Sequence, residues 1–161
     1  MHSQVLDFLR RMQARWPAAL GPDALAGGRV LECGSYIING SPRAVYGAGT
    51  EYVGLDWRAG PGVDALGLTH AYTDATGQGF DLVVSTEMLE HDPYWPASLA
   101  NMARLVKPGG SLLVTCAGPA RGPHEVDCAP ARGEQASSGH YRGLSAVEVV
   151  VELRRAAVWA H

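Results

Sequence analysis

The sequence predicts an α/β fold, a doubly wound and mostly parallel sheet of about five strands in the order 3-2-1-4-5 with helices on both faces. Two patterns in the 161 residues lead to this prediction. Short apolar runs alternate with longer segments whose apolar residues recur at helical spacing, as in successive βαβ units. Runs that are apolar throughout are typical of parallel strands covered on both faces, and right-handed crossovers wind such a sheet. We therefore expect a single domain spanning residues 1–161.

Each predicted element has its own local signal. The predicted strands are short, apolar and rich in β-branched residues, and they cover residues 29–33, 51–56, 62–66, 80–85 and 110–116. The predicted helices carry an apolar face and cover residues 3–16, 93–106 and 144–159, with a short helical turn in the segment PRAVYG. The segment KPGG ends the second helix, and Ser145 with Glu148 forms a capping-box pattern at the start of the third.

The composition argues against several classes of protein. Hydrophobic residues make up 47% of the chain, which indicates a globular domain. The formal net charge is −3 and there is no basic block, so general binding to nucleic-acid phosphates is not expected. Charged residues interrupt the apolar positions of residues 1–16, so we expect neither a signal peptide nor a membrane contact, and a cytoplasmic location. Three cysteines without a CxxC spacing indicate reduced thiols.

Residues 117–143 stand apart from the alternating pattern. They are rich in Gly, Pro, Ala and Ser and show no periodicity. A loop of this length in a compact domain is usually either a functional lid or a disordered segment, and the sequence leaves both readings open.

The predicted ligand site lies where the first two strands end. In an open α/β sheet, ligands bind beyond the carboxyl ends of the strands, where the strand order reverses. Gly34 follows the first strand and lets a ligand approach the backbone. Asp56 ends the second strand with a carboxylate that can accept hydrogen bonds from both ribose hydroxyls. Taken singly, they fit an ordinary turn and a solvated acid better, but together they indicate an adenosine-containing ligand.

The loop around Gly34 distinguishes between nucleotide classes. A dinucleotide fingerprint requires GxGxxG, whereas the segment GSYIIN lacks the second and third glycines. Glu32 precedes the glycine by two positions. A carboxylate there would repel a pyrophosphate but would suit a ligand with an ammonium group, as in S-adenosylmethionine.

Five blocks in a common order resemble class I S-adenosylmethionine-dependent methyltransferases of the broad type 11 group. They are VLECGS, YVGLDW, FDLVVSTEMLEHDPYW, ARLVKPGGSLLVTCAG and HYRGLSAVEV. Each block is weak alone, and the specificity comes from their order. The resemblance implies a Rossmann-like methyltransferase domain, with S-adenosyl-L-methionine as cofactor and S-adenosyl-L-homocysteine as product.

The resemblance also implies roles for individual residues. Gly34, Ser35 and Tyr36 would lie along the methionine part of the cofactor. Glu32 would fix that loop, and Asp56 would hold the ribose. The residues expected near the adenine are Trp57, Thr69 and His70, and those expected near the reacting methyl group are Ser85, Thr86 and Glu87.

Glu87 and His91 are the candidate catalytic residues. They are four apart and would share one face of a helix, and a general base is needed only if the acceptor must lose a proton. Glu87, Glu90 and His91 also resemble the metal motif of small-RNA 2'-O-methyltransferases and ubiquinone-pathway O-methyltransferases, which holds a divalent ion such as Mg²⁺. His124 or His140 would have to complete such a site. The alternative is that these acidic residues stand at the start of a helix, where the helix dipole favours negative charge. We therefore assign no metal ligands.

Three features depart from the family pattern. Tyr36 stands at the second glycine, and Leu68 replaces an acid near the adenine amino group. The sequence stops at His161, before the antiparallel strand pair that completes the sheet of family members. We therefore expect an exposed fifth-strand edge, which a second copy or another partner would cover, and a chain that is truncated, partner-dependent, or reduced and inactive.

The leading hypothesis is methyl transfer from S-adenosylmethionine to an O or N acceptor on a small molecule. The first alternative is a catalytically decayed methyltransferase fold that serves as a binding or scaffold protein, which Tyr36, Leu68 and the missing strand pair favour. The second is a nicotinamide-dependent oxidoreductase, which the incomplete GxGxxG opposes.

Overall fold

The computed structural model describes residues 3–122 and 140–158. The strands are β1 (Arg29–Cys33), β2 (Glu51–Asp56), β3 (Ala65–Leu66), β4 (Phe80–Thr86) and β5 (Val106–Thr115). The helices are α1 (Ser3–Arg15), α2 (Pro17–Leu20), α3 (Pro22–Leu25), α4 (Arg43–Tyr46), α5 (Trp95–Leu105) and α6 (Ala146–Val158). Two short 3₁₀ turns, η1 (Thr69–Ala71) and η2 (Leu89–His91), follow β3 and β4.

The five strands form one parallel sheet in the order β3-β2-β1-β4-β5, which confirms the predicted fold class. The central strand is β1, in which Leu31 pairs with Val53 of β2 on one side and with Val83 of β4 on the other. The chain crosses from one half of the sheet to the other between β3 and β4. The carboxyl ends of β1, β2 and β4 therefore meet at one edge, where a ligand crevice is expected.

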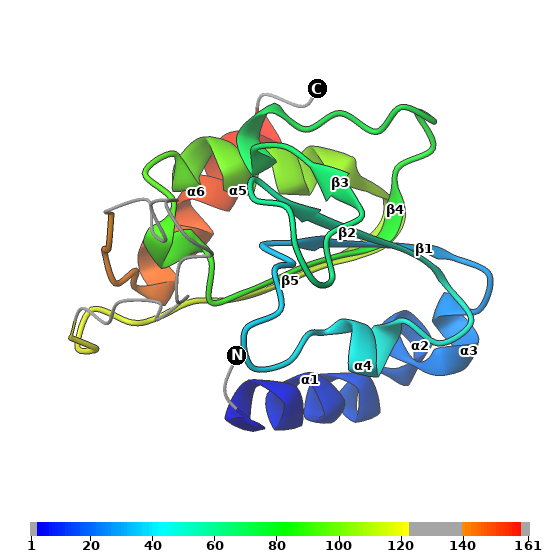
Figure 1. The fold of residues 1–161 in the computed structure, drawn as a ribbon. Helices are drawn as coiled ribbons and strands as arrows, with labels where there is room; N and C mark the ends of the chain where they lie inside the picture. Colours follow the sequence, from blue (N-terminus) through cyan, green and yellow to red (C-terminus); the bar gives the residue numbers. More distant parts are fainter. Residues whose placement is uncertain (1–2, 123–139, 159–161) are drawn as a thin grey trace.

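Each face of the sheet has its own apolar core, because successive strand residues point to opposite faces. Leu31 and Val83 cluster with residues of α5 and with partly buried residues of α6. Val30 and Leu82 cluster with residues of α1, α2, α3 and α4. Figure 1 shows these two helical layers above and below the sheet.

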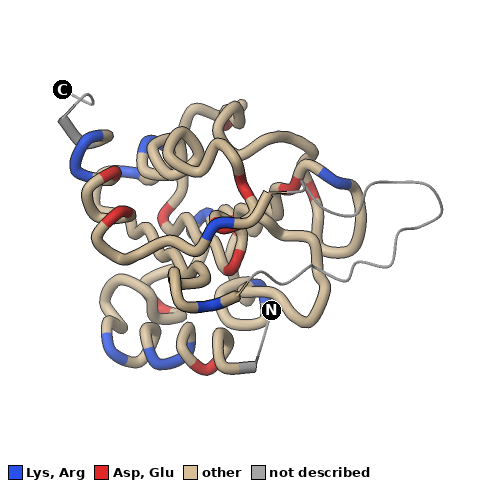
Figure 2. The backbone as a smooth tube through the Cα atoms, turned by 90° about the vertical axis from the view of Figure 1, so that its left-hand side faces the viewer, with Lys and Arg blue, Asp and Glu red and all other residues tan. Residues whose placement is uncertain are grey.

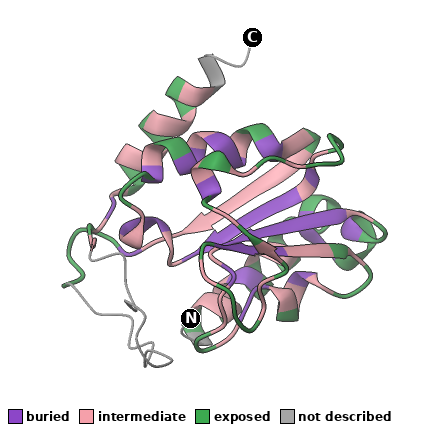
Figure 3. Cartoon of the chain, turned by 45° about the horizontal axis from the view of Figure 1, so that its top comes forward, coloured by how far each residue is buried: buried purple, intermediate pink, exposed green. Residues whose placement is uncertain are grey.

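One of the two edge strands of the described sheet, β5, is only partly covered. All of β1 is buried, whereas every residue of β5 is partly or fully exposed (Figure 3). The expectation of an exposed fifth strand is thus confirmed for the described residues. The predicted capping box at the start of α6 is also present, since Ser145 N donates to Glu148 Oε2 (2.9 Å) and Glu148 N donates to Ser145 Oγ (3.2 Å).

Two strands differ clearly from the predicted limits, and a third, β4, extends one residue further, to Thr86. The sequence predicts a third strand at residues 62–66, but β3 contains only Ala65 and Leu66. Gly62 has a φ of 83°, and the carboxylate of Asp64 accepts a hydrogen bond from the Gly54 amide (2.7 Å), so this stretch forms a turn. The fifth strand begins at Val106 instead of residue 110, so α5 ends at Leu105 and the KPGG segment forms the start of β5.

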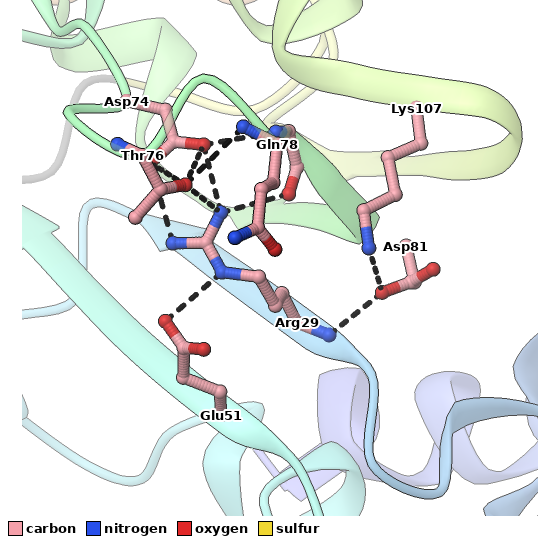
Figure 4. Close-up of polar contacts among 8 residues, drawn as sticks. Arg29, Glu51, Asp74, Thr76, Gln78, Asp81 and Lys107 are labelled. Atoms are coloured by element: carbon pink, nitrogen blue, oxygen red, sulfur yellow. Dashed lines mark hydrogen bonds and ion pairs between the residues drawn. The ribbon is translucent and has the colours of Figure 1, made fainter.

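A buried guanidinium joins the amino ends of several strands (Figure 4). Arg29, the first residue of β1, donates from Nη1 to Asp74 Oδ2 (2.7 Å) and from Nε to Glu51 Oε1 of β2 (2.9 Å). The backbone amide of Arg29 donates to Asp81 Oδ2 of β4 (2.7 Å). The same oxygen of Asp81 accepts a hydrogen bond from Lys107 Nζ of β5 (2.8 Å). The network therefore aligns four strands and the loop that leads into β4.

No helix of the described residues is long and apolar enough to cross a bilayer. Acidic and basic residues are interspersed along the described backbone (Figure 2).

We expect Arg29→Met to lower the free energy of unfolding by about 3 kcal/mol, because it leaves a carboxylate buried without its partner. The side chains of Arg29 and Asp74 are only 8% and 7% exposed. The matched control is Arg10→Met, because Arg10 pairs with Asp7 at the surface and both side chains are more than half exposed. Urea denaturation should show a change below about 0.5 kcal/mol for this control. Equal losses in the two variants would contradict the structural role of Arg29.

Candidate functional site

The tips of β1 and β2 are joined through their backbone. The carbonyl oxygen of Leu55 accepts hydrogen bonds from the amides of Gly34 (2.9 Å) and Ser35 (3.1 Å). The carboxylate of Asp56 accepts the amide of Tyr36 at Oδ2 (3.1 Å) and the amide of Arg58 at Oδ1 (3.0 Å). The sequence places Gly34 and Asp56 at one edge, and the structure brings their segments into contact there.

The ring of Tyr36 packs against the loop between β2 and β3. The guanidinium carbon of Arg58 lies 3.8 Å from the centroid of the Tyr36 ring. A Cβ added to Gly60 would come within 2.1 Å of Tyr36 Cε2, so the ring takes the space that a side chain there would need. The substitution of a glycine by Tyr36 in the family pattern is thus accommodated by a glycine in the neighbouring loop.

The side chain of Met88 lies against Gly34. A Cβ added to Gly34 would come within 2.6 Å of Met88 Cγ, and Gly34 has a φ of 81°. Both observations explain why glycine stands at this position. The methionine arm of a cofactor at Gly34 would lie beside Met88, whose unbranched thioether can adopt several rotamers.

Glu32 is buried in β1 and is hydrogen-bonded to the loop that follows this strand. Its Oε2 accepts hydrogen bonds from Ser41 Oγ (2.6 Å) and from the hydroxyl of Tyr52 (2.8 Å). Burial raises the pKa of Glu32 to about 7, and the hydrogen bonds from Ser41 and Tyr52 oppose this shift. Ser41 lies at the far end of the loop that begins at Gly34, so Glu32 fixes the path of that loop.

The other predicted cofactor residues differ in exposure. The side chains of Ser35, Thr69, Ser85 and Thr86 are buried, and Ser85 Oγ donates to the carbonyl of Cys33 (3.0 Å). Trp57 is 54% exposed, and the ring of His70 lies 4.7 Å from that of Tyr94. Their roles toward a cofactor remain predictions.

A second group of residues gathers where β4 and β5 end. Glu87 has a φ of 53°, which is unusual for a residue other than glycine; residues held in such conformations cluster at ligand-binding and active sites. Its Oε1 accepts a hydrogen bond from Thr115 Oγ1 (3.1 Å), and its Oε2 forms an ion pair with Arg121 (3.0 Å). The expectation that Glu87 and His91 share a helix face is wrong, because η2 begins only at Leu89.

Residues 140–144 lie over this second group. The ring of Tyr141 lies 5.3 Å from that of His91, and its hydroxyl donates to the carbonyl of Arg121 (3.3 Å). The amide of Arg142 donates to the carbonyl of Glu90 (2.8 Å). The ends of the predicted long loop are therefore anchored beside the candidate catalytic residues, whereas residues 123–139 lie outside the described part of the chain.

Glu90 is an acid with an unusual environment. Its side chain is fully buried, and neither carboxyl oxygen has a hydrogen-bond partner among the described residues. Burial raises the pKa of Glu90 to about 7, and the nearby charge of Glu87 raises it further. The backbone amides of Glu90 and Ala117, which approach the carboxylate without reaching hydrogen-bonding geometry, and the charge of Arg121 oppose the shift. The described residues contain no group of three His, Cys, Asp or Glu side chains that could hold a metal ion. His124, one of the suggested additional ligands, lies outside the described residues.

Comparison with known proteins identifies the family. Residues 5–140 match a family model described as "Methyltransferase domain". The chain belongs to this family.

Individual relatives agree with the family assignment. The ubiquinone biosynthesis O-methyltransferase of Thiobacillus denitrificans (strain ATCC 25259 / T1) is 35% identical over 121 residues, which cover 65% of this chain and 50% of that protein. The methyltransferase domain described here thus spans about half the length of that curated relative.

Solved structures show the same fold. The 1,6-didemethyltoxoflavin-N1-methyltransferase of Burkholderia thailandensis has a TM-score of 0.61 at 19% identity, over 92% of this chain and 66% of that one. The [4+2]-cyclase SpnF has a TM-score of 0.60 at 18% identity, over 92% of this chain and 57% of that one. At such identities the likeness establishes the fold of the methyltransferase domain and nothing further.

Three residues that lie at the carboxyl ends of the strands were not predicted from the sequence. They are Arg58 on Tyr36, Met88 on Gly34 and Arg121 on Glu87. Each contact joins loops that are distant in the sequence. Gly60 could have indicated the position of the Tyr36 ring, but only after the pairing of β1 with β2 was known.

We expect Gly34→Ala to destabilise the methyltransferase domain by about 2 to 4 kcal/mol, the sum of a left-handed backbone at alanine and an overpacked contact with Met88. Gly49→Ala isolates the backbone cost, because Gly49 has a φ of 73° and no atom lies within 4 Å of an added Cβ. It should cost about 1 to 2 kcal/mol. Adding Met88→Ala to Gly34→Ala should recover only the part of the loss that is due to Met88 Cγ, because the Cβ of Met88, 2.7 Å from the added Cβ, remains. Chemical denaturation that shows equal losses for Gly34→Ala and Gly49→Ala would contradict the Met88 contact.

We expect Glu90→Gln to stabilise the domain increasingly as the pH rises. The pKa of Glu90 is raised in the folded state, so the wild type is most stable below the unfolded pKa and loses stability as the pH rises toward about 7. Glutamine cannot ionise, so its advantage should grow to the order of 3 kcal/mol between about pH 5 and about pH 8. Glu152→Gln, at a surface ion pair with Arg155, is the control and should show almost no such trend. A pH-independent difference for Glu90→Gln would refute this account of the buried acid.

Proposed function

We propose that this methyltransferase domain binds S-adenosylmethionine and transfers its methyl group to an oxygen or nitrogen atom of a small molecule. The observation that supports this best is the position of Asp56, whose carboxylate lies at the tip of β2 within hydrogen-bonding distance of the loop that begins at Gly34. Membership of the methyltransferase family and a relative named as an O-methyltransferase support the proposal from a separate direction.

The cofactor would lie across the tips of β1 and β2. Each oxygen of Asp56 accepts one backbone amide and can accept one further hydrogen bond, so the carboxylate retains capacity for the two ribose hydroxyls. The half-exposed ring of Trp57 would pack against the adenine. The methionine arm would follow the backbone at Gly34 beside Met88, and the loop held by Glu32 would support it.

The reaction is an in-line displacement at carbon, for which the bound cofactor supplies the reactive methyl group. The protein contributes orientation of the acceptor and exclusion of water. The second group of residues, at the ends of β4 and β5, would provide this. His91 would accept the proton of a hydroxyl acceptor, with its ring held beside Tyr141. Glu87, fixed by Thr115 and Arg121, would shape the wall of the acceptor site.

The principal alternative is a domain that keeps the fold without binding the cofactor. One solved neighbour is named as a [4+2]-cyclase, so this fold does not by itself establish methyl transfer. The alternative is favoured by the position of Met88 against Gly34 and by Tyr36 at a family glycine. Cofactor binding distinguishes the two directly.

We expect isothermal titration to show micromolar binding of S-adenosylhomocysteine and no binding of NADH. Asp56→Ala should weaken binding by at least about tenfold, because charge-assisted hydrogen bonds to the ribose are lost. An analogue of S-adenosylhomocysteine without the two ribose hydroxyls separates this loss from a loosened loop. It should bind the wild type more weakly than S-adenosylhomocysteine does, whereas Asp56→Ala should bind the two ligands alike, because the acceptor of the ribose hydroxyls is gone.

The control substitution is Asp7→Asn, at an exposed ion pair on α1, and it should leave the dissociation constant unchanged. Binding of neither ligand would favour the decayed domain, and binding of NADH alone would favour an oxidoreductase. If removal of the ribose hydroxyls weakens binding to Asp56→Ala as much as binding to the wild type, Asp56 does not bind the ribose.

A further inference from the structure

Two residues of the loop that follows β2 contact the ring of Tyr36 and together form a clamp on it. The guanidinium of Arg58 stacks on one face, at 3.8 Å from the ring centroid. A Cβ added to Gly60 would come within 2.1 Å of Tyr36 Cε2, so the backbone at Gly60 also lies against the ring. A cation over an aromatic face at this distance is attracted by the ring quadrupole, and the planar guanidinium suits stacking better than an ammonium does.

The backbone reinforces this clamp. The two oxygens of Asp56 accept the amides of Tyr36 (3.1 Å) and Arg58 (3.0 Å), so one carboxylate holds both partners of the stack. One residue further on, the amide of Ile37 donates to the carbonyl of Pro61 (2.9 Å). The turn at Gly34 and the loop after β2 therefore form one unit, with side-chain stacking added to backbone hydrogen bonds.

We propose that Arg58 is a positioning residue for the cofactor, which holds the turn from Gly34 to Tyr36 in the place that the amino-acid arm of an adenosyl ligand requires. This inference rests on the proposed function. The nucleoside end of such a ligand would be held at the end of β2, by Asp56 and by Trp57, which follows it. The amino-acid arm would depend on the turn after β1, which Arg58 reaches through Tyr36.

The division of the site suggests a selective test. S-adenosylhomocysteine carries the amino-acid arm, whereas 5'-methylthioadenosine has the same nucleoside and thioether without it. We expect Arg58→Ala to weaken binding of S-adenosylhomocysteine about tenfold and binding of 5'-methylthioadenosine less than about twofold. A residue with a purely general structural role would weaken both ligands alike. The comparison is needed because the guanidinium carbon of Arg58 also lies 5.9 Å from the centroid of the Trp57 ring.

Further variants address the stack itself. Tyr36→Leu should reproduce the effect of Arg58→Ala, and the double variant should be no worse than either single one, since both remove the same contact. Arg58→Lys keeps the charge without the planar stack, so its affinity for S-adenosylhomocysteine should lie between those of the wild type and Arg58→Ala. Arg15→Ala, which removes a guanidinium from above Trp16 on the surface, should change nothing.

The outcomes are distinguishable by titration calorimetry, with thermal denaturation of each variant to confirm folding. An equal loss for both ligands, or no loss for either, in Arg58→Ala would overturn the positioning role and leave the proposed function standing. If the wild type binds neither ligand, the proposed function falls and the role of Arg58 with it. If Arg58→Ala does not fold, the same two-ligand comparison in Arg58→Lys decides the question.

Discussion

Arg29 joins the amino ends of four strands of the described sheet. Its guanidinium spans from Glu51 of β2 to Asp74 in the loop before β4, while its backbone amide shares Asp81 of β4 with Lys107 of β5. A buried cation with several oxygen acceptors tolerates little displacement, because each lost contact leaves a charge without compensation. The register that it stabilises carries through the parallel ladders to the carboxyl ends, where Gly34, Asp56 and Glu87 emerge.

The site follows from that register in two parts. At the tips of β1 and β2, backbone amides converge on Leu55 and Asp56, and side-chain packing by Met88 and Arg58 sets the walls. At the tips of β4 and β5, charged residues and the segment 140–144 meet around a buried acid. The first part has the chemistry to hold a nucleoside and the second part has the chemistry to handle an acceptor. The pairing of β1 with both β2 and β4 places the two parts side by side.

The fold and the meeting of Gly34 with Asp56 could be predicted from the sequence because both depend on strand pairing, which apolar runs and their order already encode. The capping box at Ser145 was predictable for a different reason, since its signal is local in the sequence. The positive φ of Glu87 and the burial of Glu90 were not predictable, because they depend on how the turn after β4 packs under residues that come some fifty positions later. The place of the Tyr36 ring likewise depends on Arg58 and Gly60 in a different loop.

The most direct test of the central claim is a crystal structure of this domain with S-adenosylhomocysteine bound. The account predicts the ribose hydroxyls within about 3 Å of the two oxygens of Asp56, with the homocysteine arm along Gly34 and the Met88 side chain rotated to make room. A ligand bound elsewhere on the sheet, or a ribose held by residues other than Asp56, would contradict it.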